Sequence, residues 1–288
     1  MRLYTTDRGI GWEDRPGTLS LLDLPQQDLG ELLSGPGLEA ARRAAVTSEI
    51  ALVDATVLAP VRRPGKILIV GLNYPSHAEE ALEAFAAMGR SDITMPSEPN
   101  MQLVAGSATV GTAAQIRLPA MAPNEVDYEG ELAVVIGRNT CAVSADQAWG
   151  HVAGLTIAND LGARDIQRRA MTGDATASIG LAKSFDTFKP LGPCLVTADE
   201  FSEAVDLGLQ THVNGELRQD DRTSSFIYSI PELIAHLSRY QTLQPGDVIC
   251  TGTPRGAGAF TRRFLRPGDI VEVAIERIGV LRNQVSAA

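Results

Sequence analysis

Short apolar runs, bounded by glycine, proline and asparagine, set the hydrophobic pattern of this chain. Residues 206–220 predict a hairpin, because Asn214-Gly215 suits the tight turn between two antiparallel strands. Residues 269–278 alternate apolar and charged side chains, and the run 279–285 follows directly. Three further runs have the length of buried strands: residues 66–71, 131–136 and 152–158. The pattern predicts a mainly β core with α additions, and not a doubly wound sheet.

Helical patterns are fewer. Residues 231–240 predict a helix with Ser229 near its N-cap and a proline in its first turn. Capping boxes predict a helix that begins at Ser144, and another that runs from Ser76 to about Met88. Residues 171–189 are rich in loop signals, and a long irregular stretch inside a compact domain is usually functional or mobile.

The start of the chain differs from the rest. It contains turn signals and one short helical stretch, residues 38–46. Two prolines and a glycine in residues 59–65 predict a linker, because they block both helix and central strand. We therefore expect a small N-terminal α+β domain over residues 1–60 and a larger domain over residues 61–288.

Charge and composition narrow the function classes. The 288 residues carry a net charge of −10, which argues against nucleic acid or an anionic membrane as a partner. No apolar run reaches the ~18 residues of a membrane span, and the N-terminus has no apolar signal core. We expect a cytoplasmic protein. The cysteines, Cys141, Cys194 and Cys250, are widely spaced, so we expect buried, inert thiols rather than zinc ligands or disulfides.

Acidic residues occupy alternate positions at Glu125, Asp127, Glu129 and Glu131, and the apolar stretch 132–136 follows. On a strand, alternate side chains share one face, about 7 Å apart. Carboxylates this close on a partly buried surface need a cation or protonation. The alternative, an exposed edge with the acids in water, explains this segment equally well.

A further acid, Asp160, ends the apolar run at 152–158, and the end of a buried strand is a usual place for a ligand. If the chain becomes helical at Asp160, then Arg164 and Gln167 share its face. Carboxylates without softer ligands suit Mg²⁺, Mn²⁺ or Ca²⁺. Arg164 could instead form an ordinary ion pair with Asp165 or Asp160.

His77 and Glu80 lie three residues apart on one face of the predicted helix. A carboxylate beside an imidazole orients it and raises its basicity, as a water-activating base requires. The alternative is an ordinary surface pair. The position of His77 after a strand and a Gly/Pro turn favours a site.

Together these segments resemble the fumarylacetoacetate hydrolase family, in particular its acylpyruvate-hydrolase-like members, over roughly residues 60–285. The motifs are Gly71-Leu72-Asn73-Tyr74-x-x-His77-x-x-Glu80, Asp127-Tyr128-Glu129-x-Glu131, Asn159-Asp160-x-x-Ala163-Arg164-Asp165-x-Gln167, Lys183-Ser184-Phe185-Asp186 with Gly192-Pro193, Thr251-Gly252-Thr253-Pro254-x-Gly256-x-Gly258, and Pro267-Gly268-Asp269-x-Val271-Glu272-Val273. Their order and spacing match together, which makes the combination specific.

The resemblance implies a β-roll-like catalytic domain, a smaller N-terminal domain and a homodimer. It implies Glu129, Glu131 and Asp160 as ligands of one divalent metal ion, Mg²⁺ or Mn²⁺, with Ca²⁺ as an alternative; His77 and Glu80 as the catalytic dyad; Arg164, Gln167 and Lys183 as oxyanion-side and substrate-binding groups; and Tyr74 and Thr253 as substrate contacts. The chain departs from the family pattern at residues 102–105, where many relatives carry a lysine, and at Gly162 and Arg255. The first and third departures leave substrate identity open.

The implied chemistry is metal-assisted cleavage of a small 2-oxo acid. We rank first the hydrolysis of a C–C bond in a 1,3-dioxo acid of the acylpyruvate or fumarylpyruvate type, giving pyruvate and a carboxylic acid, as in aromatic catabolism. The same enolate arises in an oxaloacetate decarboxylase and in isomerases or dehydratases of 2-oxo acids, which are the alternatives. A non-catalytic metal-bound module is disfavoured, because it needs no base.

Overall fold

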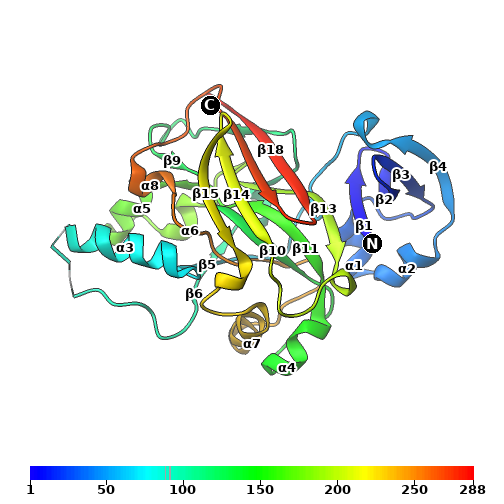
Figure 1. Cartoon of the computed structure of the whole chain (residues 1–288), viewed down its shortest axis with the longest axis horizontal. Coiled ribbons are helices and arrows are strands. Elements are labelled where there is room, and N and C mark those ends of the chain that lie inside the picture. The colour runs from blue at the N-terminus through cyan, green and yellow to red at the C-terminus, as the bar shows by residue number, and fades with distance from the viewer. Residues whose placement is uncertain (88, 91) are drawn as a thin grey trace.

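The structure, a computed structural model, describes residues 1–87, 89–90 and 92–288. Strands form the sheets at its core and exceed the helices, which lie around the sheets, so the predicted mainly β fold class with α additions is confirmed (Figure 1). Met88, the expected end of one helix, lies outside the described residues. No helix in the described ranges has the length and apolar character that crossing a membrane requires.

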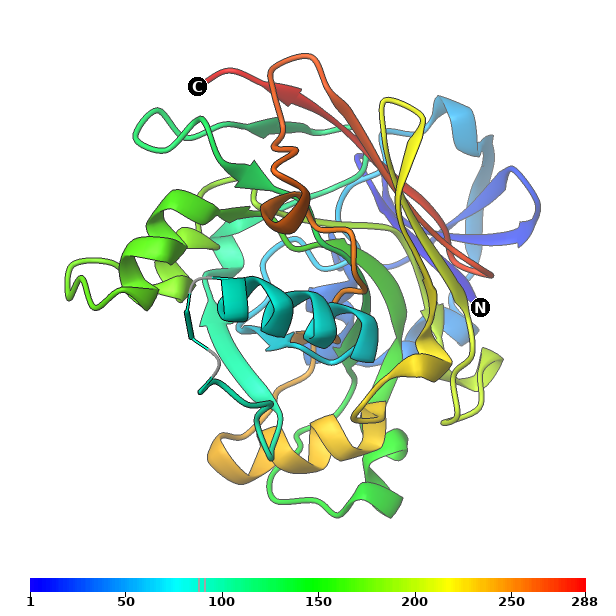
Figure 2. The ribbon, with the colours of Figure 1, turned by 60° about the vertical axis from the view of Figure 1, so that its left-hand side comes forward.

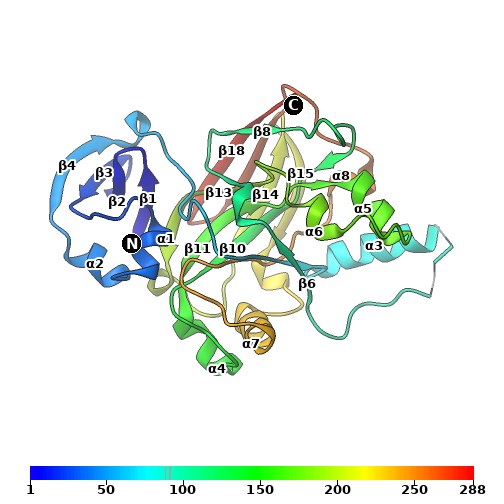
Figure 3. The same cartoon turned by 180° about the vertical axis from the view of Figure 1, so that it is seen from behind.

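The larger sheet has the strand order β4-β3-β2-β1-β13-β11-β10-β16-β5-β6, and β7 pairs with β13. Its strands are β1 (Arg2–Thr6), β2 (Gly9–Arg15), β3 (Thr18–Leu22), β4 (Val46–Ala51), β5 (Ile67–Gly71), β6 (Asn100–Val104), β7 (Thr109–Val110), β10 (Gly130–Ile136), β11 (Val152–Asn159), β13 (Lys189–Thr197) and β16 (Val248–Cys250). β1 pairs antiparallel with β13, so the N-terminal unit extends this sheet at one side of the molecule (Figures 1 and 3). A domain boundary near residue 60 stays a prediction.

The second sheet has the order β15-β14-β17-β18-β8. Its strands are β8 (Gln115–Arg117), β14 (Gly208–Val213), β15 (Glu216–Arg222), β17 (Ile270–Ile275) and β18 (Gly279–Ser286). The predicted hairpin is confirmed, with Asn214 and Gly215 both at positive φ in the turn. The two sheets pack through fully buried side chains such as Leu132, Leu209 and Val273. A separate pair, β9 (Val126–Asp127) and β12 (Gly162–Ala163), lies beside them.

The helices are α1 (Leu29–Ser34), α2 (Leu38–Arg43), α3 (Pro75–Ala87), α4 (Ala145–Ala148), α5 (Arg164–Met171), α6 (Ile179–Ala182), α7 (Ile230–Tyr240) and α8 (Gly258–Thr261). In Figure 2, α3 (cyan) crosses the front, with α8 (orange) above it and α5 and α6 (yellow-green) to its left. Ser229 caps α7 in a reciprocal capping box with Glu232. The helices predicted at Ser144 and Ser76 are present as α4 and α3, but their capping boxes are not: Ser144 is the N-cap of α4 without a capping bond, and Ser76 lies inside the first turn of α3 and donates to Asp221.

Residues 171–189 are mostly irregular, as predicted, with regular structure limited to the last residue of α5, the short α6 and the first residue of β13. One other local prediction needs correction. Cys141, expected to be buried, is exposed, whereas Cys194 and Cys250 are buried. Cys141 precedes Ala142, whose positive φ marks a turn at the surface.

Gly154 on β11 lies directly against β13. A Cβ added there would lie 2.3 Å from the carbonyl oxygen of Val196 and about 3 Å from the Leu195 side chain. We expect Gly154→Ala to lower the free energy of unfolding by about 1–3 kcal/mol, measured by denaturant unfolding, because backbone must move. The matched control is Gly150→Ala, whose Cβ meets nothing within 4 Å. Equal stability of the two variants would contradict this packing.

Candidate active site

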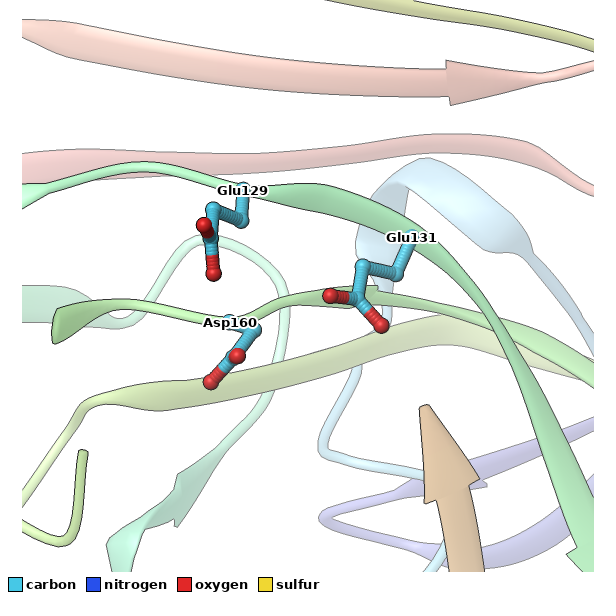
Figure 4. A group of neighbouring side chains, drawn as sticks. All are labelled: Glu129, Glu131 and Asp160. Atoms are coloured by element: carbon cyan, nitrogen blue, oxygen red, sulfur yellow. The ribbon is translucent and has the colours of Figure 1, made fainter. Parts of the chain in front are cut away.

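Three carboxylates meet where two central strands lie side by side (Figure 4). Glu129 and Glu131 flank Gly130 at the start of β10, and Asp160 directly follows Asn159 at the end of β11. Gly130 pairs with Asn159, which brings the two segments together. All three acids are buried, and one oxygen from each lies within 4.8 Å of the others. We call these three residues the acid group.

The predicted strand over the four alternating acids is interrupted. β9 ends at Asp127 and β10 begins at Gly130. Asp127 does not belong to the acid group and accepts a 2.6 Å hydrogen bond from the Gly258 N–H at the start of α8. Glu125 pairs with Arg168 near the surface at 2.6 Å. The predicted single strand over the four acids is therefore wrong, and only Glu129 and Glu131 of the four belong to the acid group.

Arg164 connects the two sets of acids. Its Nε donates to Asp127 at 2.8 Å, and one terminal nitrogen donates to Glu129. The expected helix at Asp160 is wrong, because β12 intervenes and α5 begins only at Arg164. Asp165, the alternative partner, instead accepts a bond from the N–H of Ile166. The guanidinium is thus held among buried acids, not in a surface pair.

Gln167, beside Arg164, has a side-chain N–H donor that no described residue accepts. Its Oε1 accepts a 2.7 Å bond from Arg164, which directs Nε2 away from the arginine. The buried Nε2 has no hydrogen-bond partner among the described residues. A Cβ on Gly162 would lie 2.5 Å from this nitrogen, so the glycine leaves room for the amide.

Two lysines, Lys183 and Lys189, supply positive charge to the acid group. Lys183 donates to Asp160 and, at 2.7 Å, to Glu129. Lys189, which is fully buried, lies 2.8 Å from the other oxygen of Asp160. Its ammonium also donates to the carbonyl oxygens of Leu161 at 3.0 Å, Lys183 at 2.6 Å and Phe188 at 2.9 Å, so it is fixed in place.

The charges give the acids different proton affinities. Burial raises the pKa of Glu131 well above its usual range, and the Asp160 and Glu129 carboxylates add to the shift. Burial acts the same way on Glu129, but Arg164 and Lys183 outweigh it and hold the pKa of Glu129 well below its usual range. Burial lowers the pKa of Lys183, but Asp160 and Glu129 outweigh it and raise that pKa above normal. Lys183 is therefore a permanent ammonium.

His77 faces the acid group from the first turn of α3. Its Nδ1 lies 3.5 Å from Glu80 and its Nε2 lies 4.0 Å from Glu129. The backbone N–H of Gly256 donates to Glu80 at 3.2 Å and fixes that carboxylate. Phe260 on α8 packs edge-on against the imidazole, with ring centroids 5.4 Å apart. The pair is buried, which excludes the surface alternative.

Of the other residues singled out from the sequence, some line the cavity beside the acid group and others do not. Thr253 lines the site, and its hydroxyl donates to Gly130 O at 2.9 Å and accepts from Gln219 at 2.8 Å. Tyr74 is fully buried but does not line the cavity, and its substrate contact stays a prediction. Arg255 is exposed and also lies outside the lining, whereas Gln102 belongs to it.

A cavity of about 340 Å³ collects these groups. Its lining includes His77, Glu129, Glu131, Arg164, Gln167, Lys183 and Thr253 together with apolar side chains. That volume lies at the lower end of the ~300–1,000 Å³ typical of small-molecule sites. Sequence reasoning missed Lys189 and Gln219, although a lysine inside the apolar run Phe188–Leu191 was a visible signal.

The acid group fits a hard divalent cation. Its donors are carboxylate oxygens alone, which suit Mg²⁺, Mn²⁺ or Ca²⁺. Glu131 is buried and accepts from the Gly252 N–H at 2.8 Å, and among the described residues no lysine or arginine is bonded to it. An ionised Glu131 thus needs further positive charge, which a cation would supply.

Comparisons with known proteins bear on the whole chain. The family model described as fumarylacetoacetate (FAA) hydrolase C-terminal matches residues 66–286. Oxaloacetate tautomerase FAHD2B, mitochondrial, of Bos taurus is 42% identical over 234 residues, which cover 81% of this chain and 70% of that protein. Oxaloacetate tautomerase YisK of Bacillus subtilis (strain 168) is 40% identical over 237 residues, which cover 81% and 74%. The crystal structure of 2-hydroxyhepta-2,4-diene-1,7-dioate isomerase from Mycobacterium marinum matches with a TM-score of 0.76 and 34% identity, covering 100% of this chain and 98% of that one.

Glu131→Gln should weaken Mn²⁺ binding by at least about tenfold, measured by titration calorimetry, because it removes one of the converging carboxylates. The control is Glu125→Gln, which removes an acid of the same alternating row that pairs with Arg168 outside the acid group. Equal affinities in the two variants would show that the cation binds elsewhere.

Glu131 should also make the cation-free protein less stable as pH rises. Its pKa is raised in the folded state, so the folded protein holds a proton that the unfolded chain releases above a pKa of ~4.3. The stability contributed by that proton is lost as pH rises toward the folded pKa, by up to about 1.4 kcal/mol per pH unit. Urea unfolding in chelator between about pH 5 and pH 8 should show wild type losing stability relative to Glu131→Gln. Parallel pH profiles would contradict the raised pKa.

Proposed function

Because this chain belongs to the fumarylacetoacetate hydrolase family, we propose that it is a metal-dependent enzyme that interconverts the keto and enol forms of a 2-oxo acid. Oxaloacetate is the first substrate to test, since two relatives are named for its tautomerisation. The hydrolysis that the sequence ranks first fits these names less well than its alternative, isomerisation of a 2-oxo acid. A homodimer and a cytoplasmic location stay predictions.

One observation carries the proposal: a single cavity is lined by the His77 imidazole, by two of the three acids, Glu129 and Glu131, and by the donors Arg164, Gln167 and Lys183, while Asp160 completes the acid group behind them. A tautomerase needs a base for a carbon-bound proton and stabilisation of the negative charge on oxygen. His77 supplies the base. Arg164, Gln167 and Lys183 supply the donors, and the Gln167 Nε2 lacks any other partner in the described chain.

The residues can move the proton without a co-reactant. A divalent ion held by the acid group would supply Lewis-acid polarisation of the 2-oxo carbonyl. His77 takes a proton from C3, and the electron pair of that C–H bond forms the C2–C3 double bond. Returning the same proton to the 2-oxygen completes the enol. Glu80, 3.5 Å from Nδ1, stabilises the transient imidazolium, and the Lys183 ammonium stabilises negative charge on the oxygen.

The test is a panel assayed with Mg²⁺ or Mn²⁺. Purified protein should accelerate the decay of enol-oxaloacetate, followed by its ultraviolet absorbance, and chelator should abolish the effect. Acetylpyruvate and fumarylpyruvate should release no pyruvate. Pyruvate release from either acid without tautomerisation would restore the hydrolase, and rapid CO₂ release from oxaloacetate would establish the decarboxylase.

Variants of the dyad locate the base. His77→Ala should lower kcat by on the order of 10²–10⁴-fold while leaving Mn²⁺ affinity unchanged, because His77 transfers a proton and does not ligate. Glu80→Gln should lose less, since it removes only the orienting charge. His212→Ala on β14, outside the cavity, is the matched histidine control. Loss of Mn²⁺ binding in His77→Ala would reassign His77 as a ligand.

A further inference from the structure

We infer that the cavity prefers 2-oxo acids with an uncharged, apolar group beyond C3, alkyl or aryl, over 2-oxo dicarboxylates of equal chain length, so that oxaloacetate is turned over but is not the preferred substrate. The inference rests on the proposed function and extends it beyond oxaloacetate. It comes from the way in which polar and apolar side chains are distributed along the helices that line the cavity.

Helix α3 changes from polar to apolar along its cavity face. His77, Ala81 and Phe85 are four residues apart, so they share one face, and all three line the cavity. His77 lies at the acid group, while Phe85 lies about 12 Å farther along the helix axis, at 1.5 Å per residue. A four-carbon acid spans three C–C bonds of ~1.5 Å, less than about 5 Å. Phe85 therefore lies beyond the reach of oxaloacetate held at the acid group.

Helices α5 and α6 show the same change. On α5, Arg164 and Gln167 lie at the acid group, and Met171, one helical turn beyond Gln167, lines the cavity with its side chain more than half exposed. Lys183, the C-cap of α6, binds the acids, and Ile179, one turn before it, lines the cavity. Three helices thus each place a polar group near the acids and an apolar group farther out.

The outer part of the cavity lacks a cation for a second carboxylate. Arg164 and Lys183 are the basic side chains in the described lining, and both are already bonded to the acids. Arg90, in the segment after α3, is ion-paired with Asp92 and does not line the cavity. A second carboxylate there would lose water and find only neutral donors, those of Thr94, Asn100 and Gln102, whereas an alkyl or aryl group would gain by leaving water.

The experiment uses the Mg²⁺-loaded full chain and a homologous series: 2-oxobutanoate, 2-oxopentanoate, 2-oxohexanoate and 4-phenyl-2-oxobutanoate, with oxaloacetate and 2-oxoglutarate as dicarboxylates. Exchange of C3 protons for deuterium, followed by NMR, reports turnover, and calorimetry reports affinity independently. Affinity and kcat/KM should rise by up to about fourfold per added methylene. Both dicarboxylates should bind more weakly than the monocarboxylate of equal chain length.

A paired substitution tests the location of the apolar group. Ile179→Arg adds a cation to the outer cavity and should shift the ratio of 2-oxoglutarate to 2-oxohexanoate affinity by at least tenfold toward the dicarboxylate. Leu181→Arg adds the same charge on the same helix at a residue that is 63% exposed and outside the lining, and it should leave the ratio unchanged.

The outcomes separate the two proposals. Flat or falling affinity along the alkyl series, or dicarboxylates preferred by wild type, would overturn the inference. A rising affinity series without deuterium exchange for any acid would support the apolar site and reject the tautomerase. Equal shifts in Ile179→Arg and Leu181→Arg would show a general charge effect and contradict the assigned location.

Discussion

Three carboxylates can be buried within 4.8 Å of one another only if positive charge or protons accompany them. Much of the surrounding structure supplies that compensation. The start of β13 places Lys189 beneath Asp160, the end of α6 places Lys183 beside it, and α5 begins where Arg164 reaches Glu129. Elements distant in sequence are thus held together by the charge that they must balance.

The same constraint divides the acid group internally. Glu129 is surrounded by cations and stays ionised, whereas Glu131 has one backbone donor and a raised pKa. A site that was only structural would gain stability from an amide at Glu131. Retaining a carboxylate there costs stability in the cation-free protein, a cost typical of a site kept for binding or catalysis.

The sequence predicts the fold class and the central strands well, because their apolar runs and the Asn214-Gly215 turn are local signals. It identifies the acid group through the order of its motifs. It fails where long-range partners decide: Asp127 follows the alternation but is captured by Arg164 and the start of α8. The sequence also does not predict that β1 extends the main sheet, because residues 2–6 contain no local signal for pairing with β13.

The site shows the same limit. His77, Glu80 and Arg164 were found because their spacing and neighbours carry chemistry. A lysine among apolar residues signals an unusual buried position, but Lys189 was missed because the sequence does not say which oxygens will surround its ammonium. The change from polar to apolar side chains along the cavity could not be predicted, because it depends on how α3, α5 and α6 pack around the same cavity.

The most direct test of the acid group is a crystal structure of the Mn²⁺-soaked protein with anomalous scattering recorded. We predict one anomalous peak within about 2.5 Å of carboxylate oxygens from Glu129, Glu131 and Asp160. The Lys183 ammonium should lie beside the peak, not at it. A peak at another site, or Lys183 still bridging Glu129 and Asp160 with no ion between them at saturating Mn²⁺, would contradict the account.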